Sequence, residues 1–157
     1  QRGSVVVETA LVFLPLILTL FSTLELTRGM WMYHTLTHAI KSGARFAVIH
    51  GQGCSDPSAN CQVTVGDIAT VIKQSGIGLD ASQLRLTFSA TGTSYSCATL
   101  ASCTSDQTRW PPQDHNIAGL PITIEGAYAF QSVASVLWPG NVPSFNCLGK
   151  ATEVIQF

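Results

Sequence analysis

One segment near the N-terminus constrains the fold more than any other feature of the chain. Residues 9–24, TALVFLPLILTLFSTL, contain no charged side chain, and only Glu8 separates them from the apolar residues 5–7. As a helix, this run is about 24 Å long at about 1.5 Å per residue, which suits either a short membrane span or a helix buried among other helices. Because it is apolar on all sides, such a helix must be covered by lipid or by other helices.

A cleaved signal peptide is one alternative for this segment. Arg2 would suit the basic start of a signal peptide. However, no small-residue cleavage site follows the apolar run, and helical sequence continues beyond it without a break. We therefore expect the segment to belong to a longer helix.

The continuation of the helix is amphipathic. Apolar residues recur at spacings of three and four, as on one face of a helix, and the predicted buried face consists of Met30, Tyr33, Thr37, Ile40, Ala44 and Val48. Glu25 and Arg28 are spaced for an i,i+3 ion pair. Two glycines at 51 and 53 provide a stop signal. We expect one helix over about residues 4–50, with a kink at Pro15, which lacks a backbone N–H.

The rest of the chain predicts a small α+β head. A short helix that begins near residue 65 and ends at Gly76 or Gly78 is expected to be capped by Thr64 or Asp67. Alternating apolar and polar residues predict strands over 84–90, 121–130 and 148–157, and the polar segment 91–119 is expected to be mostly loop. The predicted fold is a long N-terminal helix packed on a small antiparallel sheet. Residues 1–28 form the apolar half of that helix, and residues 29–157 form the head with its amphipathic half.

The N-terminus resembles the processing site of class 3 type IV prepilins. Gly3, Ser4 and Glu8 match a cleavage site after glycine with a glutamate at the fifth mature position. More narrowly, the motif series in residues 2–45 is similar to that of TadE-like pilins of tight-adherence (Tad) pilus systems. In chain order, the matching residues are Arg2, Gly3, Val7, Glu8, Pro15, Glu25, Arg28, Gly43, Ala44 and Arg45.

This resemblance implies a type IV pilin-like fold and a structural function. The chain would be held in the inner membrane as a precursor, be cut by a prepilin peptidase and be passed to an assembly machinery. Identical subunits would then polymerise through the apolar helix into an extracellular pilus, for which cell adhesion is one possible role. The alternative is a single-pass membrane-anchored minor pilin or accessory binding protein of a pilus or secretion apparatus.

Glu8 is the charge that this interpretation must explain, because a lone carboxylate within an apolar helix is costly unless it is paired. In type IV pilins the matching glutamate is thought to pair with the N-terminal amine of a neighbouring subunit and to set the axial register. If residues 1–3 are retained, Arg2 of another subunit is an equally good partner. Glu8 could instead simply lie at the membrane edge or interact with the helix N-terminus.

All five cysteines follow residue 53, which suggests an oxidising compartment for the head. With one cysteine unpaired, sequence alone leaves fifteen pairings open. We expect Cys54–Cys61 and Cys97–Cys103 as loop disulfides, with Cys147 free and buried. A metal site is the alternative, but no C-x-x-C motif is present.

Composition and motifs argue against other functions. A net charge of −1 lacks the basic excess of nucleic-acid-binding proteins. His34 and His38 have zinc-helix spacing without the accompanying glutamate, and Asp114–His115 lacks a nucleophile motif. We therefore expect no enzyme activity, no cofactor and no metal. An anchored enzyme would need a metal-containing cleft at Asp114 and His115.

Overall fold

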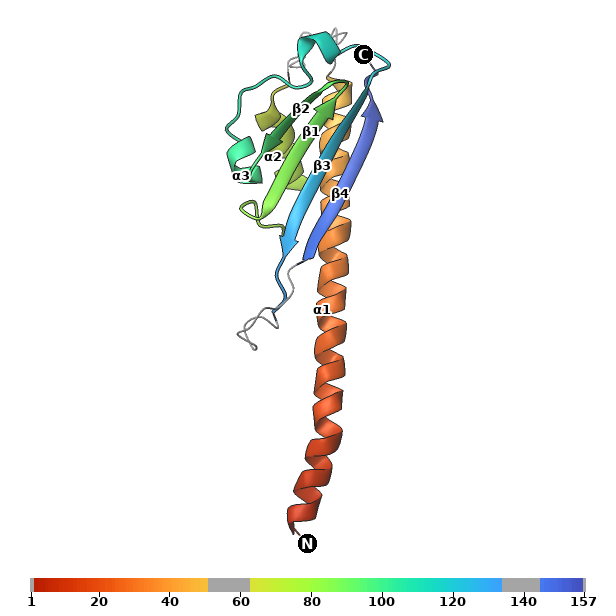
Figure 1. Ribbon diagram of the computed structural model, residues 1–157, viewed down its shortest axis with the longest axis vertical. Coiled ribbons are helices and arrows are strands. Elements are labelled where there is room, and N and C mark those ends of the chain that lie inside the picture. The colour runs from red at the N-terminus through yellow and green to blue at the C-terminus, as the bar shows by residue number, and fades with distance from the viewer. Residues whose placement is uncertain (1, 51–62, 134–144, 157) are drawn as a thin grey trace.

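The computed structural model describes residues 2–50, 63–133 and 145–156, with no description of the side chains of residues 2–4. A single helix, α1 (Arg2–Ile49), runs the length of the molecule and carries the head around its C-terminal half (Figure 1). The predicted α+β arrangement, a long N-terminal helix packed on a small antiparallel sheet, is confirmed. The helix boundaries agree with the predicted range of about 4–50 to within two residues.

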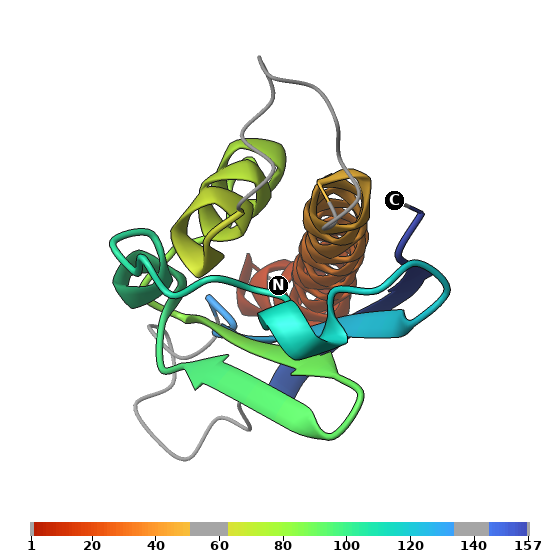
Figure 2. The ribbon, with the colours of Figure 1, turned by 90° about the horizontal axis from the view of Figure 1, so that it is seen from above.

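The sheet has four antiparallel strands in the order β2-β1-β3-β4. They are β1 (Leu84–Ala90), β2 (Thr93–Cys97), β3 (Pro121–Phe130) and β4 (Phe145–Val154). α1 and the second helix, α2 (Val65–Ser75), cover the same face of the sheet (Figure 2). Alternation along β1 and β3 turns their apolar residues toward these helices, which places the core between the sheet and the helix layer.

Local signals fix the start of α2. Thr64 is the N-cap, and its hydroxyl accepts from the backbone N–H of Asp67, whose carboxylate accepts from the backbone N–H of Thr64. The two predicted capping residues therefore act together as a capping box. Backbone carbonyls of Asp106 and Thr108 accept from the N–H groups of the first two residues of α2, at 2.9 and 2.8 Å.

The sequence missed one strand and misplaced another. The segment 91–119 is mostly loop as expected, but it also contains β2 and a short helix, α3 (Leu100–Cys103), before the 3-10 turn η1 (Gln113–His115). The last strand is β4, three residues earlier than the predicted 148–157. Its position follows from its full-length pairing with β3, from Phe130 opposite Phe145 to Pro121 opposite Val154.

The buried face of α1 also differs from the prediction. Ile40, Ala44 and Val48 are buried as expected, but Met30 and Tyr33 are 56% and 48% exposed. The core-facing residues of α1 are Leu36, Ala39, Ile40, Gly43, Ala44, Ala47 and Val48. Gly126 and Gly149, opposite each other on β3 and β4, leave room for the Ile40 side chain, whereas Met30 and Tyr33 lie nearer the N-terminus and line a groove with Phe130 and Phe145.

Candidate assembly surface

The N-terminal half of α1 exposes a predominantly apolar surface. Its exposed large apolar residues are Val5, Val6, Val7, Leu11, Val12, Phe13, Leu14, Leu16, Ile17, Leu18, Leu20, Phe21, Leu24 and Leu26. The most apolar stretch has a mean hydropathy of 2.2, and none of it is buried. By length and composition α1 can therefore cross a membrane, and it is the one helix among the described residues that can do so.

Hydroxyl groups in this segment are satisfied within the helix itself. The side chains of Thr9 and Ser22 donate to carbonyls four residues earlier, and those of Thr19 and Thr23 donate to carbonyls three residues earlier, all at 2.7–2.8 Å. Such bonds remove the cost of placing a hydroxyl where water is absent. These residues are therefore compatible with lipid and with a dry contact between helices.

Glu8 is the exception in this surface. Its side chain is exposed, and no ion pair in the described part of the chain involves it. Arg2, Gly3 and Ser4 lie in the first turn of α1. α1 continues as a helix through Pro15. The processing role of residues 3–8, the pairing of Glu8 with a terminal amine or with Arg2, and the kink at Pro15 stay predictions.

The Glu25–Arg28 pair joins α1 to the head. Their side chains lie 4.0 Å apart, as the spacing suggested. Each also contacts the chain after β3: Glu25 Oε1 accepts from the N–H of Val133 at 2.9 Å, and Arg28 Nη1 donates to the carbonyl of Gln131 at 3.3 Å. The Arg28 guanidinium lies 5.2 Å from the centroid of the Phe130 ring. Sequence reasoning missed these partners, which are more than a hundred positions away along the chain and leave no local signal.

An apolar groove lies where α1 leaves the head. It has a volume of 610 Å³, and its walls include Leu26, Met30 and Tyr33 of α1 together with Phe130 and Phe145 from the facing ends of β3 and β4. The two phenylalanine rings stack with centroids 4.8 Å apart. The groove continues the apolar surface of α1 onto the head.

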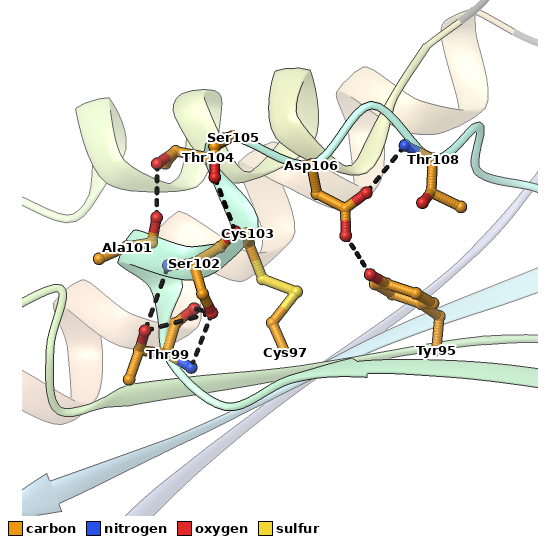
Figure 3. Close-up of a disulfide and its surroundings, with 10 residues drawn as sticks. All are labelled: Tyr95, Cys97, Thr99, Ala101, Ser102, Cys103, Thr104, Ser105, Asp106 and Thr108. Atoms are coloured by element: carbon orange, nitrogen blue, oxygen red, sulfur yellow. Dashed lines mark hydrogen bonds between the residues drawn. A yellow bond between two sulfur atoms is a disulfide. The ribbon is translucent and has the colours of Figure 1, made fainter.

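The three cysteines that the structure describes lie in the head. Cys97 and Cys103 form a disulfide between β2 and α3, the pairing that we expected (Figure 3). Cys147 is free and buried, and burial raises the pKa of its thiol. The expected Cys54–Cys61 bridge lies outside the described residues.

The loop after the disulfide is held by the carboxylate of Asp106. Asp106 accepts hydrogen bonds from the N–H of Thr108 and from the hydroxyl of Tyr95 (Figure 3). The hydrogen bond from Thr108 has the larger effect and the one from Tyr95 the smaller, and both lower the pKa of Asp106. The bond to Asp106 raises the pKa of Tyr95. Because the Asp106 and Thr108 carbonyls also hold the start of α2, this loop links the disulfide to that helix.

The residues considered for catalysis show no shared site. His34 and His38 lie on α1 and are exposed. Asp114 and His115 lie in η1. No group of three or more histidine, cysteine, aspartate or glutamate side chains suited to a metal ion occurs among the residues that the structure describes.

The fold and this surface define an α+β head on a long, partly apolar helix that can cross a membrane by length and composition. Residues 3–45 match the family model described as TadE-like protein, which confirms the resemblance seen in the N-terminal motifs. No curated protein and no solved structure gives a significant match to the chain. The family match and the apolar helix together indicate a membrane-anchored protein associated with the Tad pilus.

Proposed function

We propose that the chain is a structural pilin subunit that polymerises through α1 into a helical extracellular pilus. The observation that carries this proposal is the exposed apolar half of α1, which the head of the same chain leaves uncovered. A surface of this size needs lipid before assembly and neighbouring helices after it. Contacts that repeat without closing give a helical polymer rather than a ring.

The energetics explain both the stability of such a polymer and its need for a machine. Burying a large apolar side chain from water is worth about 1.5–3 kcal/mol. Transfer from lipid into a helix bundle gains little of this, because lipid tails are as apolar as the side chains. Extraction from the inner membrane therefore requires the Tad assembly machinery, and the finished filament resists dissolution in water.

Glu8 sets the register in this proposal. Its carboxylate lacks an ion-pair partner within the described chain. It lies among Val5, Val6 and Val7 on one side and the charge-free residues 9–24 on the other. An unpaired carboxylate in a dry contact is costly, so subunits pack in the register that supplies a cation. That cation is the amine of a neighbour processed after Gly3, or Arg2 of an unprocessed one.

The variant Glu8→Ala tests the register role, and Thr9→Ala is its matched control. Both changes lie in the same helix turn, but the Thr9 hydroxyl is already satisfied within its own helix. In cells with a complete Tad system, we expect Glu8→Ala to abolish or strongly reduce sheared filaments seen by electron microscopy, and Thr9→Ala to leave them unchanged. Tryptophan fluorescence of the purified protein, to which the buried Trp110 contributes, should stay native in both variants.

The outcomes separate the alternatives. Normal filaments from Glu8→Ala would refute the register role. Wild-type protein that stays in the membrane fraction, with no filament containing it in many copies, would refute polymerisation and favour the anchored minor pilin or accessory protein. Mass spectrometry of the N-terminal peptide reads cleavage after Gly3 independently, and an uncut peptide would overturn prepilin peptidase processing.

A further inference from the structure

The apolar groove lies at a defined height above the apolar part of α1. Residues 5–24 make a helix of about 30 Å, which matches the hydrocarbon core of a bilayer. Arg28 then lies about 6 Å beyond the core, within the headgroup layer, which is about 5–8 Å deep. The ring of Phe130 lies beside the Arg28 guanidinium, and Phe145 stacks on Phe130. The groove-side ends of β3 and β4 therefore lie at headgroup level.

Polar contacts keep the head at this height. Glu25 and Arg28 bond to the backbone of Val133 and Gln131, just past the end of β3. A Cβ atom on Gly29 would already touch the ring of Phe130, at 4.0 Å, so helix and strand are in close contact here. The end of the sheet nearest the exposed half of α1 is thus fixed to the helix rather than free to swing away from it (Figure 1).

The exposed side chains at this level suit a lipid headgroup layer. Phe145 is 51% exposed, Met30 and Tyr33 are about half exposed, and Trp31 is a further exposed aromatic residue of α1. Tyrosine and tryptophan favour the membrane interface because they combine an apolar ring with a polar tip. Arginine at the end of a span can reach the phosphates while its stem stays in apolar surroundings.

We infer that the groove and its rim, made of Met30, Tyr33, Phe130 and Phe145, rest in the phospholipid headgroup layer while the subunit is membrane-anchored. Phospholipid is the occupant because the groove is continuous with the surface of α1 that spans the bilayer and lies at headgroup height. The inference rests on anchoring by α1, not on polymerisation. It makes the head a lipid-docked unit whose apolar rim is released only when the subunit leaves the membrane.

The two ends of β4 provide a matched test. Phe145 and Val154 have nearly equal exposure, 51% and 50%, at opposite ends of the strand. The photo-crosslinking residue p-benzoyl-phenylalanine replaces Phe145, Val154 or Val12 in the full chain, reconstituted in vesicles of phosphatidylethanolamine and phosphatidylglycerol. After irradiation, intact mass reports covalent phospholipid adducts. We expect phospholipid adducts with the probe at position 145 and at position 12, and no adduct with the probe at position 154.

Each alternative result has a separate meaning. An adduct at 12 without one at 145 overturns the docking of the head while anchoring by α1 stands. Adducts of equal yield at 145 and 154 also overturn it, because the head would then touch lipid without a preferred end. No adduct at 12 overturns anchoring itself. Crosslinks from 145 to a second copy, in place of lipid adducts, show that another subunit covers the groove and refute the phospholipid occupant.

Discussion

Replacing Gly126 with alanine should destabilise the head by obstructing the packing of α1 on the sheet. A Cβ atom at this position would lie 2.4 Å from Cδ1 of Ile40, whose side chain is fully buried. Favourable carbon–carbon contacts lie near about 3.5–4.0 Å, so the helix or the side chain must move. Overpacking of this kind costs about 1–3 kcal/mol. The smaller unfolded-state entropy of alanine returns about 0.4–1 kcal/mol, which leaves a net loss of about 1–2 kcal/mol.

The same geometry predicts partial rescue. Ile40→Val removes the obstructing Cδ1 and by itself costs about 0.5–1.5 kcal/mol. In the double variant the nearest atom would be Cγ1, at 3.3 Å from the added Cβ. The two changes together should therefore cost about 1 kcal/mol less than the sum of the single changes. Gly149→Ala, whose Cβ would lie 2.9 Å from the same Cδ1, should be milder than Gly126→Ala.

Urea unfolding of the full chain in detergent micelles measures these free energies. Trp110 is 2% exposed, so loss of the head core should change the tryptophan fluorescence of the chain. An unchanged m-value would show that the same surface unfolds in each variant. If Gly126→Ala were as stable as the wild type, or if the double variant were simply additive, the close approach of Ile40 to the paired glycines would not be the constraint proposed here.

Three further predictions concern the disulfide loop and the free thiol. Reduction of Cys97–Cys103, or its replacement by two serines, should lower the free energy of unfolding by about 2 kcal/mol, the chain-entropy value for so short a loop; an unchanged melting temperature under reductant would contradict this. Because hydrogen bonds from Thr108 and Tyr95 lower the folded pKa of Asp106, the stability it adds is present above its unfolded pKa and is lost as pH falls through the folded pKa. Melting temperature against pH for Asp106→Asn should therefore fall less steeply on acidification than for the wild type, and parallel curves would exclude this contribution. Cys147 is buried with a raised pKa, so alkylation at pH 8 should be slow in the native chain and fast in urea; equal rates would show that the thiol is accessible.

Much of the fold follows from local sequence signals. The charge-free run predicted the exposed half of α1, Thr64 and Asp67 predicted the start of α2, and alternation predicted β1 and β3 with their observed boundaries. These signals are strong because each depends on a few consecutive residues. The candidate assembly surface was also predictable from local sequence, since a helix that is apolar on all sides can be recognised from its consecutive residues alone. The role of Glu8 remains a prediction, because its partner would lie on another chain.

The weaker predictions failed where contacts between distant segments determine whether a strand forms and where it begins. β2 has few apolar residues, and it forms because a two-residue turn with Gly92 at φ +81° folds it back onto β1. That turn was the local sequence signal from which β2 could have been predicted. The register of β4 was set by pairing along the whole of β3, which its own composition does not reveal.

The sequence by itself determined that α1 exists, that its first half must be covered by lipid or protein, and that a small α+β head follows. Only the tertiary structure decided how much of the predicted face of its second half is covered. Met30 and Tyr33 share that face with Ile40, Ala44 and Val48, and the paired glycines on β3 and β4 place the sheet against Ile40. Met30 and Tyr33 lie nearer the N-terminus, where α1 leaves the head, and line the groove. Helical periodicity cannot predict this, because the place where a sheet ends along a helix depends on contacts between distant segments.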